Sequence, residues 1–270
     1  MIREKGIEEI YDGHFYGPDD MVPVDTVGCA GCSDCCKNTG DSIVLDPYDM
    51  CLLCKGTGKT FAEMLEREIE VRLADGLYLP NLMQHHGKSG AFQECAVPYP
   101  DAGYPDQNPE SEAWRDWPAQ GTSAGRHQSL QEADAGDRCP FLSAAGRCSI
   151  HPYRPGFCRL FPMGRYYTED GFVYILQKDE CTGREKTPVL LRDWLGIDDL
   201  PQYEAFVRDW HVFRLQAGKA LERVTPKSRA SVRSYILQIF FAHPYMADVD
   251  FYAQYAVRME VCREALREIL

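Results

Sequence analysis

The chain has 270 residues, of which 44% are hydrophobic and 26% are charged, as in a globular protein with one large or two small cores. This composition excludes a disordered chain. No run reaches the roughly 18 consecutive apolar residues of a spanning helix, so no membrane segment is predicted. The net charge of −12 argues against a nucleic-acid partner, because phosphate binding normally requires a basic surface.

The chain contains 12 cysteines, more than an ordinary intracellular enzyme needs and fewer than a small disulfide scaffold carries. Residues 1–10 are charged and include no apolar run before a small-residue cleavage site, so they predict no secretory signal. We therefore expect a cytoplasmic protein. In that reducing compartment, clustered cysteines are metal ligands or reactive thiols more often than they are disulfides.

The first predicted helix follows Asp46, which can cap it, and begins at Pro47, which suits the first helical position. Gly56 and Gly58 end this helix. Residues 52–60 end like a phosphate-binding loop, but Leu53 stands where that motif requires glycine, and no strand precedes it. We therefore reject a nucleotide site at this position.

A second helix is predicted from Thr60, because Thr60 and Glu63 have the spacing of a capping box. Its apolar face continues at helical spacing until Asp75-Gly76 ends the helix. The members of this face are Phe61, Met64, Leu65, Ile69 and Leu73. From about 84 to 137 the chain is rich in Gly, Pro, Ser, Asp and Gln, and this composition predicts an insertion.

Two further patterns complete the expected elements. Residues 163–177 contain two β-rich runs around an Asp-Gly turn, which predicts a hairpin. After Pro201, three apolar patterns predict helices that bury their faces against one another. These patterns are carried by Phe206, Trp210 and Phe213, by Val232, Tyr235, Ile236 and Ile239, and by Phe251, Tyr255, Met259, Cys262 and Leu266.

From these elements we expect a helix-rich α+β fold, in which irregular cysteine-rich loops and a β-hairpin are backed by a C-terminal helical layer. We treat residues 1–270 as a single domain. Within it we expect a cysteine-cluster region at 28–183, interrupted by the insertion at about 84–137, and a helical layer at 190–270.

Eight of the cysteines form two groups. The first has the form C-x2-C-x2-C-C in a glycine-flanked loop, where a tight turn can direct several thiolates toward one centre and backbone amides toward their sulfurs. The second lies mainly in stiff, proline-containing turns that each present one cysteine. We assign all eight as metal ligands: Cys29, Cys32, Cys35, Cys36, Cys139, Cys148, Cys158 and Cys181.

The other four cysteines have different interpretations. Cys51 and Cys54 lie at positions i and i+3 of the first predicted helix, and Cys262 lies on the apolar face of the last, so we expect all three to pack against the core. Cys95 falls in the insertion and is unassigned. His151 lies within the second group, where a metal or sulfur contact and a role in the turn are both open.

Several motifs together resemble a known family. They are the C-x2-C-x2-C-C loop at 29–36, the Cys-Pro-Phe-Leu run at 139–142, the pattern from Gly146 to Pro162, and the later Cys181-Thr182-Gly183. In order and combination they resemble the YkgJ-like cysteine cluster proteins, a zinc- or iron-chelating family that includes flagellin lysine methylases. The resemblance covers roughly residues 28–183, and Thr182 stands where family members often carry proline.

The eight thiolates could fill two four-thiolate sites or one cluster with thiols to spare. Three cysteines at x2 spacing are typical of ferredoxin ligation, whereas zinc sites more often pair two C-x2-C units. We therefore favour an iron–sulfur cluster, with zinc as the alternative. Arg154 and Arg159 are assigned as cofactor-binding residues, because their charge would offset that of several thiolates.

Three functions remain open on the sequence. Resemblance to the flagellin methylases implies cluster-assisted modification of a protein side chain with S-adenosylmethionine, in which Arg165 would join Arg154 and Arg159 in holding an anionic group. A cluster near the surface would instead transfer electrons, and a closed zinc site would be structural and serve partner binding. The sequence predicts a metal-binding protein with a protein partner or substrate, and does not decide whether it is an enzyme.

Overall fold

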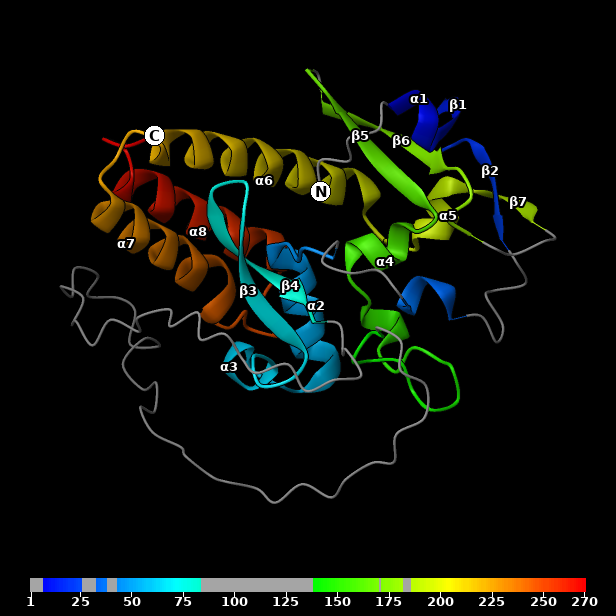
Figure 1. The fold of residues 1–270 in the computed structure, drawn as a ribbon, viewed down its shortest axis with the longest axis horizontal. Helices are drawn as coiled ribbons and strands as arrows, with labels where there is room; N and C mark the ends of the chain where they lie inside the picture. Colours follow the sequence, from blue (N-terminus) through cyan, green and yellow to red (C-terminus); the bar gives the residue numbers. More distant parts are fainter. Residues whose placement is uncertain (1–6, 26–32, 38–42, 84–137, 170, 182–185) are drawn as a thin grey trace.

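A computed structural model describes residues 7–25, 33–37, 43–83, 138–169, 171–181 and 186–270. These residues form helices and small antiparallel sheets, so the fold is α+β, as predicted. Figure 1 shows α6 (Leu200–Leu221), α7 (Pro226–Leu237) and α8 (Phe251–Ala265) gathered on one side, with the largest sheet at the far end of α6. In the described part of the chain, no helix combines the length and apolarity needed to cross a membrane.

The largest sheet has three antiparallel strands in the order β1-β6-β5. Its strands are β1 (Tyr11–Tyr16), β5 (Met163–Thr168) and β6 (Gly171–Gln177), and the short helix α1 (Ile7–Ile10) precedes them. The predicted hairpin at 163–177 is therefore confirmed. Next to this sheet, β2 (Met21–Asp25) pairs with β7 (Thr187–Leu190), which leads into α5 (Leu191–Leu195).

Helix α2 (Pro47–Thr57) forms as predicted, because its capping signals are local. Asp46 caps it, and the Asp46 and Asp49 side chains each accept a hydrogen bond from the other residue's backbone amide, at 2.8 and 3.1 Å. Gly58 ends the helix in the left-handed conformation, with φ of 69°. Gly56, expected to end the helix, instead lies in its last turn.

The second predicted helix is wrong beyond its first turn. Thr60 and Glu63 do form a capping box, but α3 (Phe61–Met64) is only four residues long. The following residues form an antiparallel hairpin of β3 (Ile69–Ala74) and β4 (Leu77–Leu82). Asp75 and Gly76 both have positive φ, at 49° and 79°, as a two-residue hairpin turn requires. The apolar residues at 69, 71 and 73 thus belong to a period of two.

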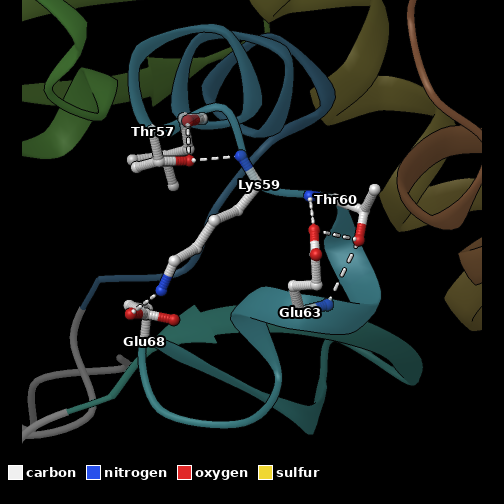
Figure 2. Close-up of polar contacts among 6 residues, drawn as sticks. Thr57, Lys59, Thr60, Glu63 and Glu68 are labelled. Carbon is white, nitrogen blue, oxygen red and sulfur yellow. Dashed lines mark hydrogen bonds and ion pairs between the residues drawn. The ribbon is translucent and has the colours of Figure 1, made fainter. Parts of the chain in front are cut away.

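The rejected phosphate-loop motif has a structural role, which Figure 2 shows. Lys59 Nζ lies 2.5 Å from Glu68 Oε1, and its backbone amide donates to Thr57 Oγ1 at 3.2 Å. Thr57 Oγ1 in turn donates to the Leu53 carbonyl at 2.7 Å. These contacts hold the turn between α2 and α3. The Lys59 ammonium is thus paired with the Glu68 carboxylate.

The predicted C-terminal helices are confirmed as α6, α7 and α8, with α7 continuing into the π-helix η4 (Gln238–Ala242). Aromatic side chains fill the space between them: the Phe206 and Tyr255 rings meet edge to face, with centroids 4.8 Å apart. Cys262 is completely buried in the core, as expected. Cys51 and Cys54 are half-buried and pack against the same core, which also agrees with the expectation.

The β3–β4 turn packs against α6 at Gly218. A Cβ atom at this position would overlap the Asp75 carbonyl oxygen and lie 3.2 Å from the Asp75 carbonyl carbon. Two polar contacts hold the turn here: Arg233 donates to the Gly76 carbonyl at 2.7 Å, and Arg214 pairs with Asp75 at 3.1 Å. The close approach of two backbones therefore requires glycine on the helix.

We predict that Gly218→Ala destabilises the protein by about 1–3 kcal/mol, because the new methyl group forces the hairpin away from α6. A glycine-to-alanine change inside a helix normally stabilises it by about 1 kcal/mol, so the sign is diagnostic. Denaturant unfolding of both proteins measures the effect. Gly17→Ala is the control, because its Cβ would be in ordinary contact, 3.6 Å from Asp20 Oδ2. Unchanged or increased stability of Gly218→Ala would contradict the packing.

Candidate metal centre

Cysteines from both sequence groups line a single cavity of about 310 Å³. The five that do so are Cys35, Cys36, Cys139, Cys148 and Cys158. Cys139 is 6% exposed, and the other four are half-buried. Apolar residues such as Ile43 and Leu82 complete the walls. Five of the eight predicted ligands, from segments distant in sequence, therefore share one cavity.

The backbone ties the first group to the second. Cys35 and Cys36 lie in the single 3-10 turn η1 (Asp34–Cys36), in which the Cys36 amide donates to the Ser33 carbonyl at 2.9 Å. The Cys36 carbonyl then accepts from the Cys139 amide at 2.8 Å. A β-bridge between Lys37 and Arg138 continues this pairing by one residue. Cys36 and Cys139 are therefore held side by side although 103 positions separate them in sequence.

Short turns bring the second group together. The Leu142 amide donates to the Cys139 carbonyl at 3.1 Å, and Leu142 forms a β-bridge with Cys148. Gly146, with φ of 69°, allows the chain to reverse between them. Cys158 follows on the short helix α4 (Gly156–Leu160). The predicted irregular turns are therefore present, except that Cys158 lies on a helix.

Burial and neighbouring thiols raise the pKa of four cavity cysteines, which are Cys35, Cys36, Cys148 and Cys158. A hydrogen bond with the Cys139 thiol, followed by burial, raises the pKa of Cys36 to about 12. The Cys35 Sγ lies 4.0 Å from the Cys36 Sγ. The hydrogen bond between these two thiols is the main cause that raises the pKa of Cys35, and burial adds to it. Burial also raises the pKa of Cys158. A bound metal cation would displace these protons, because thiolates are the ligands.

The five thiols share a cavity without forming a complete coordination sphere. Within the described ranges, no three His, Cys, Asp or Glu side chains form a group that could hold a metal ion. Cys29, Cys32 and Cys95 lie outside the described residues. Cys181, half-buried after β6, is not among the residues that line the cavity. The assignment of the eight cysteines as metal ligands stays a prediction.

The predicted cofactor-binding arginines differ in position. Arg154 lines the cavity, and its Nη1 lies 3.0 Å from His151 Nε2, which also faces the cavity. Arg159 instead donates to backbone carbonyls, to Pro152 at 3.1 Å and to Leu195 at 3.4 Å. Arg165 donates to Tyr203 Oη at 2.9 Å. Only Arg154 of these three is among the described residues that line the cavity.

Burial, with Arg154 as the next cause, lowers the pKa of His151. The imidazole therefore stays neutral at neutral pH and can receive a hydrogen bond from the guanidinium. His151 begins the 3-10 turn η3 (His151–Tyr153) between the last two cysteines of the cavity. The sequence left open a metal or sulfur contact and a role in the turn for His151. The contact that the structure describes is with the side chain of Arg154, the C-cap residue of the same turn.

Helix α2 holds the segment that carries Cys148 and Cys158. Tyr153 lies against Gly56, where a Cβ atom would come within 2.6 Å of the Tyr153 Cβ. In the first turn of α2, Asp49 Oδ1 accepts a hydrogen bond from the Gly156 amide at 2.6 Å. Sequence reasoning did not identify these contacts, because 107 positions separate Asp49 from Gly156 and no local pattern marks the pairing.

We predict that Gly56→Ala destabilises the protein by about 1–3 kcal/mol, because the added methyl group collides with the Tyr153 ring. Urea unfolding would measure this loss. The second variant, Tyr153→Ala, removes the Cγ and Cδ2 atoms that lie nearest to the added methyl group, so Gly56→Ala should cost less in that background than alone. Additive effects of the two substitutions would show that Gly56 and Tyr153 do not pack as described.

Comparison with known proteins supports metal chelation by the second group. Residues 99–182 match the family model described as "CxxCxxCC: Putative zinc- or iron-chelating domain". The match includes Cys139, Cys148, Cys158 and Cys181 and covers less than half of the chain. No curated protein and no solved structure matches the chain. The chain is therefore similar, over this segment, to a domain that chelates zinc or iron.

Proposed function

We propose that this protein holds an iron–sulfur cluster in the cavity between η1, the turns at 139–148, and α4. The observation that carries the proposal is that five thiols from two distant segments surround one cavity of about 310 Å³. A single zinc ion takes four ligands, whereas clusters occupy more space and are held by cysteine thiolates. The match to a zinc- or iron-chelating domain supports iron as one of two metals.

The proposed cluster would supply one-electron chemistry, and the protein would set its position and surroundings. Four of the five thiols are half-buried, so the cluster would lie close enough to the surface to exchange electrons or to meet a protein side chain. We propose electron transfer as its role. Cluster-assisted modification of a protein, with S-adenosylmethionine, has its support in the family resemblance. Arg154, which lines the cavity together with Arg147, could contact an anionic group.

Zinc is the second candidate, because one distance favours it. Two sulfurs on the same tetrahedral zinc, each with a Zn–S bond of about 2.3 Å, are about 3.8 Å apart. The Cys35 and Cys36 sulfurs lie 4.0 Å apart, close to that value. In this case the ion would be structural and would stabilise the loops around it.

Anaerobic purification followed by metal and sulfide analysis tests the proposal. We expect brown protein that contains iron and acid-labile sulfide and absorbs in the visible range. Colourless protein with stoichiometric zinc would overturn the iron–sulfur proposal in favour of zinc. Protein that takes up neither metal would contradict both candidates.

We predict that Cys35→Ser and Cys158→Ser each lose most of the bound metal and are less stable than the wild type. Each removes one thiol from the cavity, and metal binding is coupled to folding. Metal content per chain and the thermal unfolding midpoint are the measurements. Cys262→Ala is the matched control: this thiol is completely buried in the helical core, so its loss should leave the metal content unchanged.

The opposite pattern would refute the ligand assignment. Full metal content in Cys35→Ser and Cys158→Ser would show that the cavity does not bind the metal through these thiols. Loss of metal in Cys262→Ala, at unchanged fold, would place the site elsewhere.

A further inference from the structure

Asp49 connects the two parts of the protein that meet at the cavity. It lies in the first turn of α2 and is 2% exposed. Its Oδ1 accepts a hydrogen bond from the Gly156 amide at 2.6 Å, and its Oδ2 accepts one from the Asp46 amide at 3.1 Å. Both oxygens of this buried carboxyl group are therefore engaged with backbone N–H groups, one in α2 and one in the cysteine-bearing segment.

Gly156 also lies against Tyr203. A Cβ atom on this residue would lie 2.6 Å from Tyr203 Oη and 3.4 Å from Asp49 Oδ1. Tyr203 is itself fixed, because it is 1% exposed and its hydroxyl accepts a hydrogen bond from Arg165 Nη2 at 2.9 Å. The backbone at Gly156 thus lies against two buried side chains, which leave no room for a side chain at this position.

Cys158 follows Gly156 by two residues on α4, and it lines the cavity. A displacement of Gly156 would move this helix as a unit, because α4 begins at Gly156. We propose that Asp49 is a positioning residue that places the Cys158 thiol for metal binding by fixing the Gly156 amide. This inference rests on the proposed metal-binding function of the cavity.

The capping pair of α2 provides a matched control. Asp46→Ala removes the side chain that accepts from the Asp49 amide, yet it leaves both hydrogen bonds to the Asp49 carboxyl group in place. Asp49→Ala removes the bond to Gly156 as well. Both variants weaken the helix cap, so a purely structural role predicts similar losses of stability and similar metal affinity.

The test is anaerobic titration of the full-length, metal-free protein with Co²⁺, in which the thiolate-to-cobalt absorption band reports the affinity. Thermal unfolding of the same samples measures their stability. We expect Asp49→Ala to weaken Co²⁺ binding by about 10- to 100-fold, as loss of a ligand-orienting contact does. We expect Asp46→Ala to stay within about threefold of the wild type, and Asp49→Asn, which keeps an acceptor for Gly156, to recover much of the loss.

Each result is decisive. Equal Co²⁺ affinity of Asp49→Ala and the wild type, or equal losses in Asp49→Ala and Asp46→Ala, would overturn the positioning role and leave the metal site intact. Should the wild type hold iron and sulfide but not Co²⁺, the same variants are compared by their content of iron and sulfide. Failure of the wild type to bind either would instead contradict the proposed function. Should Asp49→Ala fail to fold, Asp49→Ser gives the same comparison, because its hydroxyl is too short to reach the Gly156 amide.

Discussion

The docking of the cysteine-bearing segment on α2 is the constraint on which the candidate metal centre depends. Residues 138–160 contain two short helical turns and isolated bridges, so turn hydrogen bonds rather than a long helix or sheet define the course of their backbone. Gly56 accommodates the Tyr153 ring, and Asp49 fixes Gly156. A regular helix with strong capping signals thus supplies the rigid surface that the irregular ligand turns lack.

This arrangement places acidic groups in an unfavourable environment, and the surrounding donors offset the cost. Burial, together with the neighbouring Asp46 carboxylate, raises the pKa of Asp49, whereas its hydrogen bonds with the Gly156 and Asp46 amides act in the opposite direction. The positive charge of Arg165 also acts to lower the pKa of Asp46 and Asp49, against the larger effect of burial. Its guanidinium donates a hydrogen bond to Tyr203 Oη. Hydrogen bonds therefore join α2 to α4 and β5 to α6, and the charge of Arg165 couples the two buried pairs.

Local sequence signals predicted a capped helix and a hairpin turn. They failed where pairing with another segment decides the structure. The capping residues around Asp46 located α2, and the Asp-Gly turn located the β5–β6 hairpin. The same reasoning extended α3 too far, because residues 69–73 satisfy helical spacing and strand alternation alike, and pairing with β4 decides between them. Cysteine spacing identified five thiols that share a cavity, yet it could not show that Arg159 holds backbone carbonyls.

The raised pKa values of Cys35, Cys36, Cys148 and Cys158 bear on how these thiols can lie close together. Like charges at the 4.0 Å that separates the Cys35 and Cys36 sulfurs would repel strongly in a partly buried site. Contacts among the thiols and burial raise the pKa of Cys35 and Cys36, so their protonated forms avoid such repulsion. A metal cation reverses this balance by stabilising the thiolates. The hydrogen bonds that fix the backbone at Gly156 and Cys139 do not involve the sulfurs, and the ligand framework can therefore persist through that change.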